Sequence, residues 1–103
     1  MADHIGAKDA REVIFTPNAT HSINQVAAGL NWKHGDVVIT SDREHNSNLV
    51  PWLQQSPSGV KLQTVKSLDD NRFDIEAFEE ACGNAGDSLR VVSLVHVGNL
   101  DGV

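Results

Sequence analysis

Three short polar stretches carry the side chains with the greatest capacity for chemistry. Residues 16–21 bring hydroxyls and an amide, residues 41–48 bring an imidazole at His45, and residues 96–99 bring an amide at Asn99. Each stretch follows a run of apolar residues that predicts a buried strand. In an open parallel sheet, ligands bind beyond the carboxyl ends of the strands. We therefore expect these stretches to meet at one edge of a sheet and to form a ligand site.

The first stretch has the pattern of an anion-binding turn. A strand that runs through a short loop into a helix presents free N–H groups at the positive end of the helix dipole. The helix is expected to begin at Ala19, and Thr20 adds a hydroxyl donor. The alternative is that Asn18 or Thr20 only caps the helix, which explains these residue types without a ligand.

The second and third stretches offer a ring and an amide. The His45 imidazole can stack on a planar ligand, carry a proton or bind a metal; alternatively it is a loop histidine in solvent. The Asn99 amide, close to His96, can donate to a ligand oxygen. Alternatively, Asn99 is a turn residue that bonds its own backbone.

The spacing of potential ligands argues against a metal site. The five histidines are scattered rather than paired at intervals of three to five residues, and Cys82 stands alone on a predicted helix face. No electropositive partner adjoins Cys82, and its helical phase points inward. We therefore predict no metal site and interpret Cys82 as a packing residue rather than a nucleophile.

Strands and helices alternate along the chain, which predicts an α/β fold with right-handed crossovers and a mostly parallel sheet. We expect a three-layer α/β/α sandwich, with 89–97 as the central, most apolar strand and 60–65 near an edge. The predicted strands are 12–16, 36–40, 60–65 and 89–97. The predicted helices are 19–34, one capped by Ser47 that ends before 57–59, and one capped by Asp74 that reaches Cys82.

Length and charge narrow the class of protein. The 103 residues allow one domain at most. A net charge of -6 without a Lys/Arg cluster argues against binding to nucleic acid or to an anionic membrane surface. No apolar run approaches the length of a membrane span, and no signal peptide is recognisable. A single cysteine mildly favours the cytoplasm.

Residues at these strand ends resemble a known family, the class V aminotransferases, and in particular its cysteine desulfurase and selenocysteine lyase branch. Residues 44–52, Glu-His-Asn-Ser-Asn-Leu-Val-Pro-Trp, are similar to that branch's Glu-His-His-Ser-Asn-Leu-Val-Pro-Trp. Residues 12–24 resemble its phosphate-binding strand, turn and helix, and residues 95–102 resemble its Thr-His-Val-Ser-Asn segment. Residues 68–78 match its acidic turn and following helix.

The resemblance implies a cofactor, pyridoxal 5'-phosphate (PLP), which acts as an electron sink. Carried over by motif, Ala19 and Thr20 would hold its phosphate, and Asn99 would bond the phenolic oxygen of its ring. His45 would stack on the ring and act in catalysis. The implied reaction removes sulfur from an amino-acid substrate, L-cysteine, leaving alanine and enzyme-bound sulfur for iron–sulfur cluster assembly.

The chain departs from the family pattern in several places. Asn18 stands in place of a glycine, His21 of an acidic residue, Gly98 of a serine and Asp101 of an aliphatic residue. The chain also resembles only part of the family's large PLP-binding domain. The small C-terminal domain, the Schiff-base lysine, the aspartate that pairs with the pyridinium nitrogen and the active-site cysteine are not among these residues.

Residues 1–103 are therefore expected to be a partial PLP-binding large domain that is inactive alone. The alternatives are a non-catalytic remnant that binds a phosphate ligand or a partner protein, and a fragment of another class V aminotransferase. A sheet with fewer strands than the family has should leave an unpaired edge. We therefore also expect a homodimer or other self-association.

Overall fold

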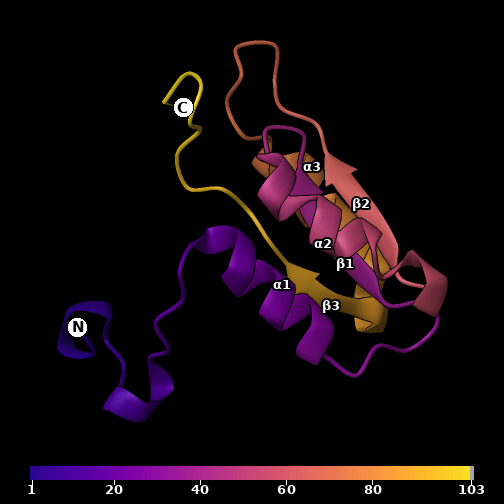
Figure 1. Cartoon of the computed structure of the whole chain (residues 1–103). Helices are drawn as coiled ribbons and strands as arrows, with labels where there is room; N and C mark the ends of the chain where they lie inside the picture. Colours follow the sequence, from indigo (N-terminus) through magenta and orange to yellow (C-terminus); the bar gives the residue numbers. More distant parts are fainter. Residues whose placement is uncertain (103) are drawn as a thin grey trace.

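A three-stranded parallel sheet forms the centre of the computed structural model, which describes residues 1–102. Its strands are β1 (Val37–Ser41), β2 (Lys61–Val65) and β3 (Leu89–Val92), in the order β2-β1-β3 (Figure 1). The parallel pairing and the edge position of β2 confirm the predictions. The prediction that 89–97 is central is wrong, because β1 is fully buried between the other two strands.

Helix α1 (Ala19–Gly29) covers one face of the sheet. Its N-cap is Asn18, whose side chain accepts from the His21 N–H. The predicted helix to residue 34 is too long. The helix ends at Gly29, and the Trp32 indole donates to the Ala27 carbonyl at 2.7 Å, so the chain turns back toward β1.

The same face is covered by α2 (Val50–Leu53), with Pro51 in its first turn as expected. The 3₁₀ turns η3 (Asn46–Asn48) and η4 (Ser56–Ser58) flank it, so the helix expected after Ser47 is divided. Trp52 packs edge-on against Trp32 with ring centroids 6.3 Å apart. The buried cluster on this face consists of Ala27, Val38, Trp52 and Val60.

Helix α3 (Ile75–Ala85) covers the opposite face, which confirms three layers. Asp74 caps it as predicted, by accepting from the Ala77 N–H at 2.9 Å. The 3₁₀ turn η5 (Gly86–Ser88) leads into β3. Cys82 is half-buried against the core, as its helical phase predicted. The buried cluster on this face consists of Val37, Ile39, Val65 and Ala81.

The N-terminal segment stands away from these layers (Figure 1). It holds two 3₁₀ turns, η1 (Asp3–Ile5) and η2 (Ala10–Glu12). The predicted strand 12–16 is wrong: no strand in the described chain pairs with it, and Ile14 and Phe15 are 73% and 79% exposed. A β-type sequence forms a strand only when a neighbour completes its hydrogen bonds.

Strand β3 ends at Val92, five residues before the predicted end. Beyond it the chain leaves the sheet, and Leu94, Val95 and Val97 are exposed. No helix among residues 1–102 has the length and apolar character that a membrane span requires.

Asp42 joins the ends of β1 and β2. Its carboxylate accepts from the Ser67 hydroxyl at 2.6 Å and from the Ser67 N–H at 3.0 Å, while the Asp42 N–H donates to the Val65 carbonyl at 3.0 Å. Desolvation raises the pKa of Asp42, but the hydrogen bonds from Ser67, aided by the nearby Arg43 charge, outweigh it and hold the pKa below 3.8.

A depressed pKa stabilises the fold above the unfolded value, and this stabilisation is lost as pH falls through the folded value. Urea unfolding at pH 5 and below pH 3.8 tests this role. The free energy of unfolding should fall less between the two pH values for Asp42→Asn than for the unsubstituted chain. The difference should stay under about 1 kcal/mol because the carboxylate is exposed and screened. Asp69→Asn, an exposed carboxylate on the next turn, is the control. An equal acid loss in all three proteins would contradict this role.

Thr40 lies in the middle of the buried layer. Its side chain is 0% exposed, and its hydroxyl has no hydrogen-bond partner within residues 1–102. A buried hydroxyl without a partner costs about 1–3 kcal/mol. Thr40→Val keeps the shape and should raise the free energy of unfolding by about 1 kcal/mol. Thr64, its exposed partner in β2, gives the matched control Thr64→Val. A destabilised Thr40→Val variant would refute this assignment.

Candidate functional site

The predicted site residues gather where the carboxyl ends of the three strands meet. Residues 42–49 follow β1, residues 66–74 follow β2 and residues 93–102 follow β3. Helix α1 begins beside them, since Ser22 in its first turn and Ser93 line the same groove. The parallel sheet thus brings the stretches after β1 and β3 to one edge. The first stretch does not follow a strand, and it reaches this edge because α1 packs against η3.

Glu44 joins three segments at this edge through its carboxylate. Oε1 accepts from the Ser41 hydroxyl at 2.7 Å and from the Val95 N–H at 2.9 Å. Oε2 accepts from the Asn48 amide at 2.6 Å. Hydrogen bonds to a charged acceptor are short and strong. Glu44 therefore fixes the loop after β1 against both η3 and the chain leaving β3.

Asn48 continues this network toward the core. The residue is buried, with 8% of its surface exposed. Its Oδ1 accepts from the Trp52 indole at 3.1 Å and from the Ser93 hydroxyl. Its Nδ2 donates to Glu44 and, at 3.3 Å, to the Ser93 carbonyl. Both ends of the amide are satisfied, so the loop is attached to the core at Trp52 and to the chain after β3.

His45 lies between these two anchors with its ring exposed. Its Nδ1 accepts from the Ser47 N–H at 3.1 Å and lies 3.0 Å from the Ser47 hydroxyl. As an acceptor, Nδ1 carries no proton in this arrangement, so the neutral ring holds its proton on Nε2. The ring is thus held at one nitrogen while its other nitrogen is a donor.

Ala19 and Thr20 form the exposed first turn of α1. Asn18 accounts for one of the first-turn N–H groups, as the capping alternative predicts. The N–H groups of Ala19 and Thr20 have no acceptor within residues 1–102, as is usual for the first turn of a helix. The structure confirms Asn18 as the cap of α1, and anion binding by Ala19 and Thr20 stays a prediction.

Asn99 is exposed and lines a hollow of about 180 Å³. Glu44 and Arg43 also line this hollow. Arg43 forms an ion pair with Asp101 and donates to the Asn71 side chain at 3.1 Å. The segment that carries Asn99 is therefore attached to the loop that carries His45.

A second hollow of about 250 Å³ lies beside the first and is mostly apolar. His96, predicted together with Asn99, lines it with Phe73 and Leu94. In the part of the chain that the structure describes, no group of three or more histidine, cysteine or carboxylate side chains could hold a metal ion.

Sequence reasoning assigned no role to Glu44, Asn48, Arg43 or Ser93. The available signal was the short, four-residue spacing between a potential acceptor, Glu44, and a potential donor, Asn48. The contacts of Arg43 and Ser93 join residues far apart in the sequence, and local spacing carries no sign of them.

The donors and acceptors at this edge fit a planar cofactor that carries a phosphate. The α1 N-terminus offers two unused N–H groups and the Thr20 hydroxyl, which suit an anion. The exposed His45 ring offers a flat surface, and Asn99 offers an amide. Members of the class V family are PLP enzymes, and PLP has this combination of a flat ring and a phosphate.

Comparison with known proteins agrees with this geometry. A cysteine desulfurase from Haloferax volcanii is 38% identical over 96% of this chain, and a probable cysteine desulfurase from Synechocystis sp. is 37% identical over 96%. The crystal structure of the cysteine desulfurase CsdA (S-sulfonic acid) from Escherichia coli matches 99% of this chain with a TM-score of 0.86 and 29% identity.

The chain spans about a quarter of the length of these relatives: 24% of both sequences and 26% of the CsdA chain. Residues 1–103, the whole sequence given, match the family Aminotransferase class-V. The chain belongs to the class V aminotransferase family, and in sequence and fold it is similar to part of a cysteine desulfurase.

Proposed function

We propose that residues 1–103 form part of the PLP-binding domain of a cysteine desulfurase. The observation that carries the proposal is the loop 44–48, which Glu44 and Asn48 anchor with the His45 ring exposed. Glu44, the residue before His45, lines one hollow with Asn99. The similarity to cysteine desulfurases supports the same function. The corresponding reaction of the complete enzyme would remove sulfur from L-cysteine and leave alanine.

Each proposed contact uses a group that the structure leaves available. The N–H groups of Ala19 and Thr20, with the Thr20 hydroxyl, would bind the phosphate at the positive end of α1. Asn99 would donate its amide to the phenolic oxygen of the ring. When bound, PLP supplies an electron sink that stabilises a carbanion formed on the amino-acid substrate.

His45 would stack on the cofactor ring and hold a proton near the reacting atoms. Its Nδ1 is occupied by Ser47, so proton exchange falls to Nε2. The hydrogen bond to Ser47 also limits rotation of the ring, which keeps one face available for stacking. We assign His45 the catalytic role on this basis.

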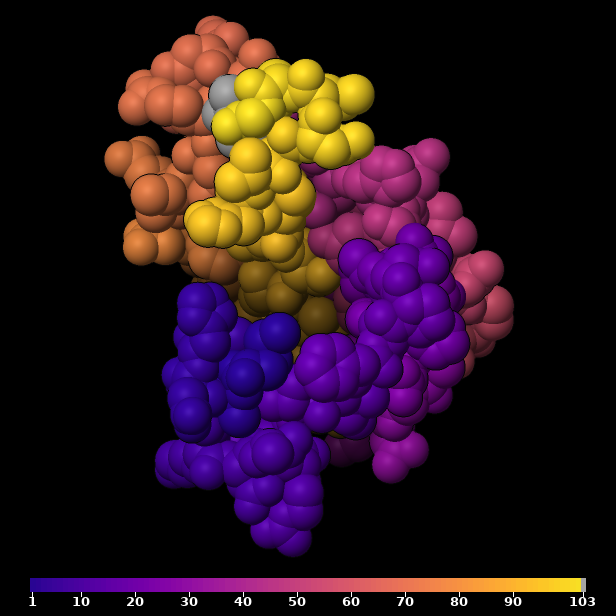
Figure 2. Space-filling model, turned by 60° about the vertical axis from the view of Figure 1, so that its left-hand side comes forward, coloured from indigo at the N-terminus to yellow at the C-terminus, as the bar shows by residue number. Residues whose placement is uncertain are grey.

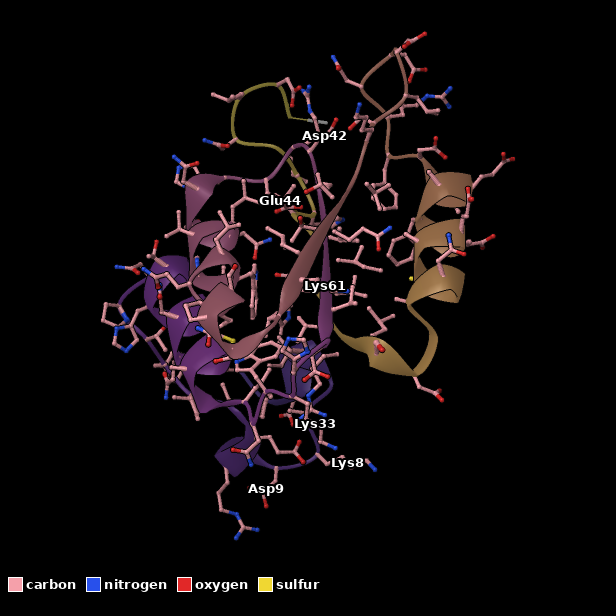
Figure 3. All side chains as sticks on the ribbon, turned by 90° about the vertical axis from the view of Figure 1, so that its right-hand side faces the viewer. Lys8, Asp9, Lys33, Asp42, Glu44 and Lys61 are labelled. Atoms are coloured by element: carbon pink, nitrogen blue, oxygen red, sulfur yellow. The ribbon has the colours of Figure 1, made fainter. Side chains whose placement is uncertain are left out.

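The positions of the lysines in this chain argue against a covalent bond between a lysine and the cofactor. Lys33 and Lys8 lie at the end of the molecule opposite Asp42 and Glu44, and Lys61 begins β2 (Figure 3). Lys66 follows β2, but it lines a hollow with α3 on the other face. We therefore propose that residues 1–103 alone bind PLP without a lysine adduct.

We propose a cytoplasmic location, which the single cysteine mildly favours.

We also propose that the isolated chain self-associates. One edge of β3 carries no strand within residues 1–102. An apolar groove of about 240 Å³, lined by Val26, Val91 and Val92 among others, runs beside it. Figure 2 shows this region recessed between the N-terminal segment, α1 and the C-terminal segment. Unpaired edges next to exposed apolar surface favour association of copies.

Titration with PLP, followed by absorbance, tests the cofactor proposal. Unsubstituted chain should shift the PLP spectrum, and His45→Ala should weaken binding roughly three- to tenfold because a stacking surface is lost. Exposed His4 in η1 gives the control His4→Ala, which should bind normally.

Borohydride reduction followed by mass spectrometry should find no lysine adduct. Equal affinities for His45→Ala and His4→Ala would contradict the role of His45. Absence of PLP binding by the unsubstituted chain would favour the remnant that binds another phosphate ligand or a partner.

Sedimentation velocity over a range of concentrations tests self-association. The unsubstituted chain should sediment faster as its concentration rises, and Val92→Lys on β3 should reduce this effect because a charge at a free strand edge opposes pairing. Gln63→Lys, the same charge change on β2 at the other edge, is the control. A clean monomer, or a stronger effect of Gln63→Lys, would contradict association through β3.

A further inference from the structure

The hydrogen bond between Glu44 and Asn48 touches neither of the groups proposed to contact the cofactor, yet it lies between them. Glu44 immediately precedes His45, and its other oxygen accepts from Val95, four residues before Asn99. Asn48 bonds both the hydroxyl and the carbonyl of Ser93. The pair thus connects the loop after β1 to two points on the chain after β3.

The chemistry of the neighbours fixes which atom of each side chain faces the other. The Trp52 indole can only donate, so it requires the Asn48 oxygen and leaves the Asn48 nitrogen for Glu44. The Glu44 carboxylate can only accept, and Ser41 and Val95 already occupy its Oε1. The contact at 2.6 Å is therefore a donor–acceptor pair of defined polarity.

We propose that Glu44 and Asn48 are positioning residues: their hydrogen bond sets the His45 loop against the segment that leads to Asn99. As far as it concerns cofactor binding, the inference rests on the proposed function. Its physical content, the coupling of the two segments, can be measured without PLP.

Exchange of the two groups provides a test by rescue. Glu44→Gln places an amide nitrogen against the Asn48 nitrogen, and Asn48→Asp places two carboxylates together. The double variant Glu44→Gln/Asn48→Asp restores a donor–acceptor pair of reversed polarity. In that variant the amide at position 44 keeps one oxygen for Ser41 and Val95. The carboxylate at position 48 likewise keeps one oxygen for the Trp52 indole and the Ser93 hydroxyl, while the longer bond to the Ser93 carbonyl is lost.

The full 103-residue chain would be compared as unsubstituted protein, both single variants, the double variant and the control Glu79→Gln on the exposed surface of α3. Hydrogen exchange at the Val95 amide, measured by NMR without PLP, reports the coupling. Each single variant should exchange about tenfold faster or more, since hydrogen bonds to charged groups are strong. The double variant should return to within a few-fold of the unsubstituted chain, and the control should not change.

PLP titration of the same proteins provides the second measurement. Both single variants should bind more weakly, and the double variant should recover, although neither side chain is proposed to touch the cofactor. If Asn48→Asp does not fold, the comparison of Glu44→Gln with the double variant decides, because a second substitution improves the first only where the two side chains meet.

A double variant no better than Glu44→Gln at Val95 would overturn the positioning proposal. Rescue at Val95 with no PLP binding by the unsubstituted chain would support the positioning pair and count against the proposed function. The two failures are therefore distinguishable.

Discussion

The arrangement of the candidate site depends on one carboxylate. Glu44 accepts hydrogen bonds from the residue that ends β1, from the first turn after it and from the chain that leaves β3. Asn48, which bonds Glu44, also accepts a hydrogen bond from the Trp52 indole in the core. A carboxylate suits this position because it can accept from several donors at once and bonds each strongly. The exposed His45 ring is thus supported by a network that is itself anchored to the packed layers.

The rest of the molecule is less well packed. Among the strands within residues 1–102, only β1 is covered on both faces and both edges, and the buried clusters on its two sides are small. The radius of gyration is 14.8 Å, against about 13 Å for a compact chain of this length. The extended N-terminal segment, with Ile14 and Phe15 in solvent, accounts for much of the difference. Stability is therefore concentrated around β1 and the carboxyl edge, where the candidate site lies.

Features determined by neighbouring residues could be predicted from the sequence. The caps at Asn18 and Asp74 and the strands β1 and β2 follow from local patterns, and the structure confirms them. The segment 12–16 has an equally good strand pattern, but a strand also needs a partner, and residues 1–102 do not provide one. The Trp32 indole bond that accompanies the early end of α1 was likewise invisible to the helical pattern.

The candidate site was predictable only in part for the same reason. The types and order of His45, Thr20 and Asn99 indicated a ligand edge, since parallel strands bring such residues together. The bonds from Asn48 to Ser93 and from Glu44 to Val95 span 45 and 51 residues. Contacts of that range depend on the register of the folded sheet, which no local spacing encodes.

The most direct test of the account is a map of where PLP contacts the chain, obtained from NMR spectra of isotope-labelled protein with and without the cofactor. The account predicts shifts at the backbone amides of Ala19 and Thr20, the side-chain amide of Asn99 and the ring of His45. The amides around Lys8 and Lys33 at the far end should not change. Shifts confined to the lysines, or spread evenly over the surface, would contradict a cofactor site at the carboxyl edge of this sheet.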